Sequence, residues 1–339
     1  MKYFSTFDLI DKYRFKGINF FIFIGGRNTG KTFGTLKELC DRLLKFFYVR
    51  RTDTQVKISM RGNLYSKIAD IFPEEKYQGI ECEYSKEVSY IYDHEDKIMA
   101  YAGSLNTMHN LTGADYSDCD VLFWDEFIRK KGERRVIDDE LLSFQWAYET
   151  LSRNRELEGK DPLIAILCSN ANTITNDIFI GLNIVSKIEE CIKNGNDLYI
   201  DYKKGVLVKM LETPEELLEA RKKTAIARFS EGTKYYDISL KNEFAADDFN
   251  FVCKLSIKGY KPLCQVNSWY IWEKKNDDLI YITYHKARTR LFYNLDLDVD
   301  RISFVRTFPW LTGYYENKRI RFESIELKEI FLAIFFRKR

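Results

Sequence analysis

Several features that would assign the chain to a common class are absent from its sequence. The 53 basic and 51 acidic residues leave a net charge of +2, so no global positive field marks a nucleic-acid binder. No apolar run approaches the roughly 20 residues that a membrane span requires, and we expect no membrane partner. The seven cysteines form no Cys-x-x-Cys pair. Their odd number, without a recognisable signal peptide, makes us expect reduced thiols in a cytosolic setting.

The sequence does contain a glycine-rich loop within FFIFIGGRNTGKTFG, residues 20–34. Gly25, four further residues and then Gly30-Lys31-Thr32 match G-x-x-x-x-G-K-[ST] between a strand-like and a helix-like run. The glycines let backbone N–H groups surround a phosphate, and the following helix points its positive end at the same anion. We expect Lys31 to neutralise the β and γ phosphates and the Thr32 hydroxyl to ligate Mg²⁺. The alternative is a glycine turn with a coincidental Gly-Lys-Thr. The predicted nucleotide-binding residues of this loop are Gly25, Gly26, Arg27, Asn28, Thr29, Gly30, Lys31 and Thr32.

Two adjacent carboxylates end a second apolar run, in DCDVLFWDEFIRKK, residues 118–131. In P-loop proteins an acid at such a strand end orders Mg²⁺, which is the role we assign to Asp125. The next acid, Glu126, is the candidate general base that polarises the attacking water. An acidic cap on the next helix is the alternative for both. Nothing resembles the Asn-Lys-x-Asp guanine reader of GTPases, so we expect the nucleotide to be ATP.

The pattern of apolar runs predicts an α/β fold around these motifs. We expect strands over 46–50 and 162–168, a hairpin of 90–92 with 98–102, and helices over 36–44 and 138–155. Alternating strands and helices imply a mostly parallel sheet that binds ligands at its carboxyl edge. Asn170 follows the strand over 162–168, where it would sense the γ-phosphate or orient the water; a simple turn residue is equally compatible.

Two arginines, Arg153 and Arg155, lie two positions apart in LSRNREL, residues 151–157. In ring ATPases such an arginine reaches a neighbouring subunit and stabilises charge on the transferring phosphoryl group. The alternative is a surface ion pair, for Arg153 with Glu149 or Glu156.

Several segments in order resemble the DNA-packaging motor ATPase of the small protein-primed podophages, an ASCE-type P-loop viral genome packaging ATPase. They are FIGGRNTGKT, FFYVRRT, VLFWDEFIRKK, LSRNRE, LCSNANTI and RKKTAIARFSEGTKYYDISLKNEF, which together span about residues 15–250. The resemblance implies a homo-oligomeric ring, a pentamer, that pushes double-stranded DNA into a prohead. The ring would dock transiently at the portal vertex in the host cell cytoplasm, on the portal itself or through a packaging RNA. It also makes Arg153 the leading trans-acting finger and places Arg27 near the nucleotide or the adjacent subunit.

The resemblance further implies three domains. These are a P-loop ATPase domain over 1–205, a small helical linker over 206–246, and a C-terminal nucleic-acid- or portal-binding domain over 247–339. The last would have a β-rich α+β fold like a vestigial RNase H-type nuclease. The sequence partly agrees, because Pro214 begins a helix with acids in its first turn and SWYIWEKKNDDLIYITY, residues 268–284, reads as a hairpin.

Asp296, Asp298 and Asp300 would share one face if NLDLDVDR were a strand. Three such carboxylates could hold two metals for phosphodiester cleavage, but we favour the solvated face of an edge strand. A terminase-like motor with an active nuclease therefore stays open as an alternative function. A nucleotide-dependent assembly switch is another.

DNA contact requires basic residues that face phosphates. RKKGERR, residues 129–135, directly follows the catalytic strand and is one candidate; a solvated loop is the alternative. From Phe249 onward there are 17 basic and 10 acidic residues, an excess of seven positive charges. The second candidate surface lies in this part of the chain and comprises Lys286, Arg288, Arg290, Lys318, Arg319 and Arg321.

Overall fold

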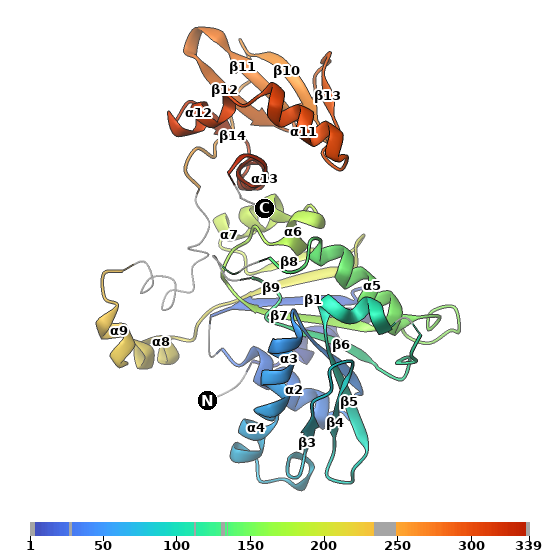
Figure 1. The fold of residues 1–339 in the computed structure, drawn as a ribbon. Coiled ribbons are helices and arrows are strands. Elements are labelled where there is room, and N and C mark those ends of the chain that lie inside the picture. Colours follow the sequence, from blue (N-terminus) through green and yellow to red (C-terminus); the bar gives the residue numbers. More distant parts are fainter. Residues whose placement is uncertain are drawn as a thin grey trace. The chain divides into compact units, whose positions relative to one another are not determined.

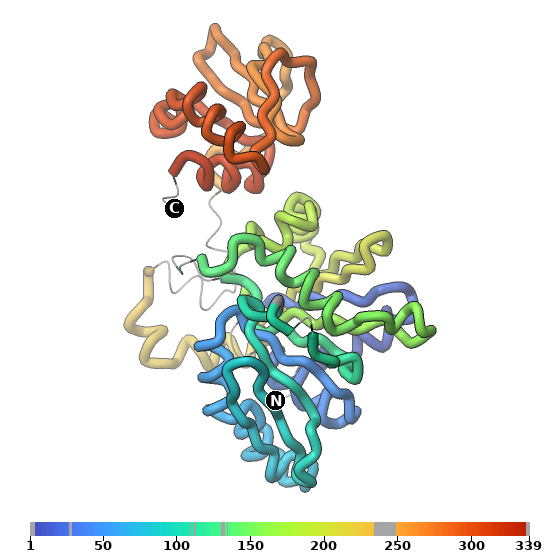
Figure 2. The backbone as a smooth tube through the Cα atoms, turned by 45° about the vertical axis from the view of Figure 1, so that its right-hand side comes forward, coloured from blue at the N-terminus to red at the C-terminus, as the bar shows by residue number. Residues whose placement is uncertain are grey.

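The computed structural model describes residues 4–26, 29–111, 113–129, 133, 135–233 and 249–336 (Figures 1 and 2). Two compact units divide the chain: unit 1 covers 1–182 and 187–246, and unit 2 covers 183–186 and 247–339. Arg27, Asn28 and most of the basic loop over 129–135 lie outside the described residues, so their predicted roles stay predictions.

Unit 1 contains, within the described residues, a nine-stranded sheet of order β3-β4-β5-β2-β6-β7-β1-β9-β8. In this order, neighbouring strands of the run β5-β2-β6-β7-β1-β9 pair in parallel. At the two edges of the sheet, β4 pairs antiparallel with β5 and β8 pairs antiparallel with β9. The strands are β1 Phe20–Gly25, β2 Phe46–Arg50, β3 Glu81–Glu83, β4 Ser89–Tyr92, β5 Ile98–Ser104, β6 Val121–Asp125, β7 Ile164–Asn170, β8 Leu198–Asp201 and β9 Val206–Leu211. The predicted strand over 46–50 and the predicted hairpin are confirmed.

Helices cover both faces of this sheet (Figure 1). Alternate strand residues such as Phe23 and Phe123 share one apolar core with side chains of α1, α2, α3 and α4. On the opposite face, Trp124 of β6 stacks on Phe144 of α5, with ring centroids 5.5 Å apart. The helices of unit 1 are α1 Phe7–Tyr13, α2 Lys31–Asp41, α3 Asp53–Arg61, α4 Ser66–Ile71, α5 Glu140–Ser152, α6 Asp177–Gly181, α7 Val185–Lys193, α8 Glu215–Lys222 and α9 Ala225–Phe229.

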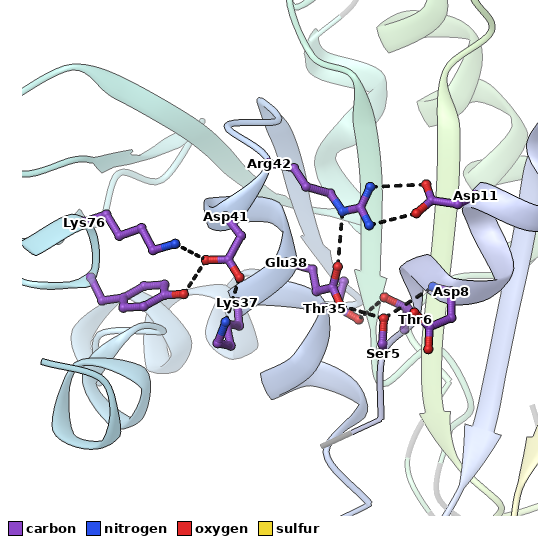
Figure 3. Close-up of polar contacts among 11 residues, drawn as sticks. Ser5, Thr6, Asp8, Asp11, Thr35, Lys37, Glu38, Asp41, Arg42 and Lys76 are labelled. Atoms are coloured by element: carbon purple, nitrogen blue, oxygen red, sulfur yellow. Dashed lines mark hydrogen bonds and ion pairs between the residues drawn. The ribbon is translucent and has the colours of Figure 1, made fainter. Parts of the chain in front are cut away.

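Polar contacts fix α2, the helix that follows the phosphate loop (Figure 3). Arg42 donates to Asp11 of the N-terminal segment at 2.8 Å and to Glu38 of its own helix at 3.1 Å. Lys76 pairs with Asp41 at 2.6 Å from the other side. The backbone of Phe4 also approaches α2 so closely that a Cβ on Gly34 would lie 2.2 Å from the Phe4 carbonyl oxygen.

Strand β9 begins at the residue where the linker was expected to start. All six of its residues pair in parallel with β1, from Phe20 beside Val206 to Gly25 beside Leu211. The sheet therefore extends past position 205, because Val206, Leu207 and Val208 form a buried apolar strand. Helices α8 and α9 follow, with Glu215 and Glu216 in the first turn of α8 as expected from the helix dipole.

Unit 2 has, in its described part, a five-stranded sheet of order β13-β10-β11-β12-β14. Strands β10, β11 and β12 form an antiparallel meander, and each outer strand adds in parallel. Aromatic side chains such as Trp269, Phe304 and Phe331 fill its core. The mostly parallel sheet of unit 1 and this β-rich α+β unit confirm the predicted fold class. The elements are β10 Lys261–Val266, β11 Trp269–Lys274, β12 Leu279–Thr283, β13 Phe292–Tyr293, α11 Asp298–Thr307, α12 Leu311–Glu316, β14 Ile320–Phe322 and α13 Ile325–Phe335.

The expected edge strand through Asp296, Asp298 and Asp300 is wrong. Helix α11 begins at Asp298, and Asp298 and Asp300 lie in its first turn, where carboxylates stabilise a helix N-terminus. The Asp300 carboxylate accepts the backbone N–H of Asn294 at 2.9 Å. No group of three or more His, Cys, Asp or Glu residues in the described part of the chain could hold a metal ion. Nor is any described helix long and apolar enough to cross a membrane.

A buried ion pair joins β2 to α5. Arg51, whose side chain is 2% exposed, donates to Glu140 at 2.8 Å and to the carbonyl of Phe127 at 2.6 Å. Glu140 is the first residue of α5, and burial raises the pKa of its carboxyl group although Arg51 opposes the shift. The pair therefore fixes the start of α5 beside the end of β6.

We predict that Arg51→Ala destabilises unit 1 by about 3 kcal/mol, because it leaves the Glu140 carboxylate buried without its partner. Calorimetric unfolding of the full chain measures the change. The matched control is Arg42→Ala, which breaks a half-exposed pair and should cost about 1 kcal/mol or less. If both substitutions lowered the free energy of unfolding by the same amount, the stabilising role assigned to Arg51 would be contradicted.

Candidate active site

The loop after β1 holds a buried lysine. Gly30, in the left-handed region at φ 86°, ends the loop, and α2 begins at Lys31. The Lys31 ammonium donates to the carbonyls of Gly25 at 3.0 Å and Gly26 at 2.7 Å and to the Thr29 hydroxyl at 3.1 Å. Burial lowers the pKa of Lys31 to about 8, although the neighbouring carboxylates oppose the shift. The ammonium group of Lys31 is therefore positioned to bind an anion.

Gly25 is required for a reason that differs from the expected one. The sequence predicted a glycine because of unusual backbone angles, but the structure gives it no positive φ. A Cβ at this position would lie 2.7 Å from the Cβ of Leu211, since β9 runs directly beside β1. Close packing of these strands, rather than backbone freedom, excludes a side chain at Gly25.

The end of β6 meets the start of α2 through Thr32 and Asp125. The Thr32 hydroxyl donates to the Asp125 carboxylate at 2.8 Å. Burial raises the pKa of Asp125, while Arg50 and Thr32 act in the opposite direction. A hydroxyl and a carboxylate oxygen at this separation are the hard oxygen donors that Mg²⁺ prefers. The residue types and their contact thus fit the metal role predicted for both.

Glu126 follows Asp125 with a positive φ of 54°, a conformation that non-glycine residues rarely adopt. Its carboxylate is 40% exposed and accepts from Arg50 at 2.7 Å, and the same guanidinium reaches Asp125 at 3.1 Å. Such local strain is found where a side chain must be aimed for function. The backbone turn and Arg50 together set the position of the candidate base.

Arg50 is a site residue that the sequence reasoning missed. Only the strand pairing reveals it: Val49 of β2 lies beside Trp124 of β6, so the next residues of both strands are neighbours at the carboxyl edge. Tyr48, two positions earlier, also donates to Asp125, at 3.3 Å. The FFYVRRT segment therefore contributes two side chains that contact Asp125 at the carboxyl edge of the sheet.

Lys31, Thr32, Asp125 and Glu126 line one cavity of about 550 Å³. Asn170, at the end of β7 beside Gly25, lines it as well, in the place expected for a residue that contacts the terminal phosphate or the water. The sequence reasoning did not foresee the wall contributed by α2 and α4. The lining residues are Thr29, Gly30, Lys31, Thr32, Phe33, Leu36, Leu64, Lys67, Ile68, Asp125, Glu126, Ser169 and Asn170.

Arg153 does not line this cavity. It is the residue that ends α5, where its backbone has φ 42° and ψ −124°. Its side chain is 36% exposed, donates to the Ala114 carbonyl and lies 3.8 Å from Asp115. Asp115, rather than the Glu149 or Glu156 of the alternative interpretation, is thus its acidic neighbour. Arg155 is buried, and it donates to the carbonyls of Cys119 and Asp161. Of the two arginines, Arg153 is the more accessible.

The sequence matches the protein family described as Podovirus DNA encapsidation protein (Gp16) over residues 2–339. The DNA packaging protein of Bacillus phage phi29 is 26% identical over 309 residues, which cover 88% of this chain and 84% of that protein. The DNA packaging protein of Bacillus phage B103 is 25% identical over 332 residues, covering 93% and 96%.

A solved structure of the bacteriophage Phi-29 viral genome packaging motor assembly aligns with a TM-score of 0.69 at 20% identity, over 98% of both chains. The Phi-28 gp11 DNA packaging motor aligns with a TM-score of 0.65 at 18% identity, over 99% of both chains. These two likenesses show a shared fold. Because the family match spans nearly every residue, the chain belongs to the Podovirus DNA encapsidation protein family.

Proposed function

We propose that the protein is an ATP-hydrolysing motor that drives double-stranded viral DNA through the portal into a preformed prohead. The observation that carries this proposal is the single cavity that joins Lys31, the Thr32–Asp125 contact and Glu126. The relatives support the role in DNA packaging, since those of phages phi29 and B103 are named DNA packaging proteins.

The residues of the cavity divide the chemistry among them. Lys31 and the loop from Gly25 to Thr32 bind the β and γ phosphates of ATP. Thr32 and Asp125 hold Mg²⁺, which when bound neutralises phosphate charge. Glu126 takes a proton from the attacking water as its general base, and Arg50 keeps that carboxylate in place. Asn170 orients the water or contacts the terminal phosphate.

The site is completed by Arg153 of a neighbouring subunit. Developing charge on the transferring phosphoryl group is stabilised by an arginine that a second subunit supplies, an effect of roughly 10³ to 10⁵ on turnover. Arg153 is exposed and lies outside its own cavity, which supports action in trans. Hydrolysis then depends on the position of the neighbour, as a ring of subunits around one DNA requires.

The partners follow from the motor assemblies that share this fold. We propose a homo-oligomeric ring, a pentamer, docked at the portal in the host cell cytoplasm, directly or through a packaging RNA. Residues 1–211 form the ATPase domain, α8 and α9 belong to the helical linker, and unit 2 binds DNA or portal-associated nucleic acid. The basic loop over 129–135 is the other candidate for DNA contact.

Within unit 2, four of the six proposed basic residues are the better candidates for phosphate contact. Arg319 pairs with Asp278, and Arg321 lies over the Phe251 ring at 5.4 Å. Lys286, Arg288 and Arg290 are exposed in the segment between β12 and β13, and Lys318 is exposed just before β14. A non-specific nucleic-acid surface needs such accessible charges.

Our prediction for the chemistry concerns two substitutions. Lys31→Ala should abolish ATP binding because the anion loses its buried counter-charge. Glu126→Gln should bind ATP like the wild type but hydrolyse it at least 100-fold more slowly, since general-base catalysis contributes about 10² to 10⁴. Equilibrium binding and phosphate release measure the two effects. Near wild-type turnover by Glu126→Gln would refute the assignment of the base.

Subunit mixing tests the shared site. Arg153→Ala subunits, inactive alone, should regain ATPase when mixed with Glu126→Gln subunits, because an intact cavity can then receive a neighbour's Arg153. Lys160→Ala, which removes an exposed ion pair of the following turn, is the control and should stay fully active. Mixed oligomers without recovered activity, or a fully active Arg153→Ala protein, would exclude the mechanism.

For unit 2, we predict nucleic-acid binding without cleavage. Arg288→Ala together with Arg290→Ala should weaken DNA binding and lower the salt slope by about two, because two phosphate contacts are lost. Arg319→Ala, which removes a residue already paired with Asp278, should have little effect. Metal-dependent nicking of supercoiled plasmid that Asp298→Asn abolishes would instead support the nuclease alternative. An ATPase rate that DNA leaves unchanged would favour the assembly switch.

A further inference from the structure

The nucleotide cavity extends beyond the phosphate loop. Lys31 and Thr32 lie in the first turn of α2, and Leu36, which also lines the cavity, lies four positions after Thr32. At about 1.5 Å per residue, ~6 Å separates Thr32 from Leu36 along the helix axis. The cavity therefore follows one side of α2 past the residues that serve the β and γ phosphates. We name this second part the α2–α4 end, and its lining residues are Phe33, Leu36, Leu64, Lys67 and Ile68.

Helix α4 forms the wall of this end that faces α2. Ile68 of α4 and Leu36 of α2 are buried in the same apolar core, which holds the two helices together. Lys67 and Ile68 follow Leu64 at spacings of three and four, so the three side chains reach the cavity from one side of α4. Lys67 is exposed, in contrast to Ile68. The wall thus adds a single cation, besides Lys31, to the described lining of the cavity.

The charge of Lys67 is not compensated by the protein. Among the described residues, no hydrogen bond or ion pair involves its ammonium group. The two acids of the cavity, Asp125 and Glu126, are both bound by Arg50. On an open surface such a lysine would need no partner other than water, but Lys67 lies in the wall of the cavity. Its charge is therefore available to an anionic group of the bound ligand.

The order of groups in ATP indicates which anion meets Lys67. The β and γ phosphates lie at Lys31 and the phosphate loop, with the γ phosphate nearest Glu126 and the attacking water. The α-phosphate comes next, followed by the uncharged sugar and base. Phe33 and Leu64 are apolar and half-buried, as suits contact with a base. The α-phosphate is thus the anionic group nearest the α2–α4 end.

We propose that Lys67 binds the α-phosphate of ATP, from the wall of the cavity opposite the phosphate loop. This inference rests on the proposed function and adds a substrate-binding residue to it. The contact is a charge-assisted hydrogen bond from the ammonium group to a phosphate oxygen. The charge of the α-phosphate does not change while the γ-phosphoryl group is transferred. The contact therefore stabilises substrate and transition state equally, and it acts on KM rather than on kcat.

Lys67→Met tests the proposal in the full chain, because it removes the charge and keeps a long side chain. We expect the Kd values of ATP and ADP, each with Mg²⁺, to rise at least tenfold, since both nucleotides carry the α-phosphate. The KM for ATP should rise in proportion, with kcat within twofold of the wild type. Lys67→Arg retains the charge and should bind both nucleotides within about threefold of the wild type. The control Lys86→Met removes an exposed charge between β3 and β4, outside the cavity lining, and should change no value more than twofold.

Two results would overturn the proposal while leaving the proposed function intact. If Lys67→Met bound ATP and ADP like the wild type, Lys67 would be a solvated residue of α4. If the affinity for ATP fell and that for ADP did not, the contact would be with the γ phosphate instead. Binding is measured without hydrolysis, so the readout is independent of the catalytic residues. A wild-type protein that binds neither nucleotide would refute the proposed function itself.

Discussion

The parallel register of β6, β7 and β1 is the constraint on which the rest of the active site depends. It places Gly25 beside Asn170 and Asp125 beside Cys168, so that β1 and β7 end together and β6 ends two residues earlier at the same carboxyl edge. The phosphate loop can then bring Thr32 within 2.8 Å of Asp125. Strand β9 strengthens the same constraint, because its close approach at Leu211 leaves no room for a side chain at Gly25.

Two consecutive arginines at the end of β2 link this edge to the rest of unit 1. Side chains of successive strand residues point to opposite faces, so Arg50 and Arg51 reach different partners. Arg50 contacts both carboxylates, Asp125 and Glu126, and Arg51 fixes Glu140 at the start of α5. Helix α5 then leads to Arg153. The same short segment of sequence thus positions the two candidate catalytic acids and the helix that ends at Arg153.

The sequence was sufficient to predict the parts of the site that depend on local spacing. Lys31 and Thr32 were predicted from the glycine-rich motif, and Asp125, Glu126 and Asn170 from strand ends; all five line the cavity. Two features that depend on pairing between distant strands were not predicted: the contact of Arg50 with Glu126 and the parallel pairing of β9 with β1. Neither is encoded by residues that are close in sequence. The stretch at Asp298 was misread because alternating acids fit a strand face and a helix N-terminus equally well, and only the packing of Phe304 in the core of unit 2 favours the helix.

The central claim is that one active site is built from two subunits, and a structure of the assembled oligomer with Mg²⁺ and a non-hydrolysable ATP analogue tests it most directly. The account predicts the guanidinium of Arg153 from one subunit about 3 Å from the terminal phosphate bound to its neighbour, the distance of a charge-assisted hydrogen bond. In that state Arg153 would no longer contact the Ala114 carbonyl and Asp115 of its own chain. An assembled, nucleotide-bound oligomer in which Arg153 keeps those contacts and lies far from every phosphate would contradict the account.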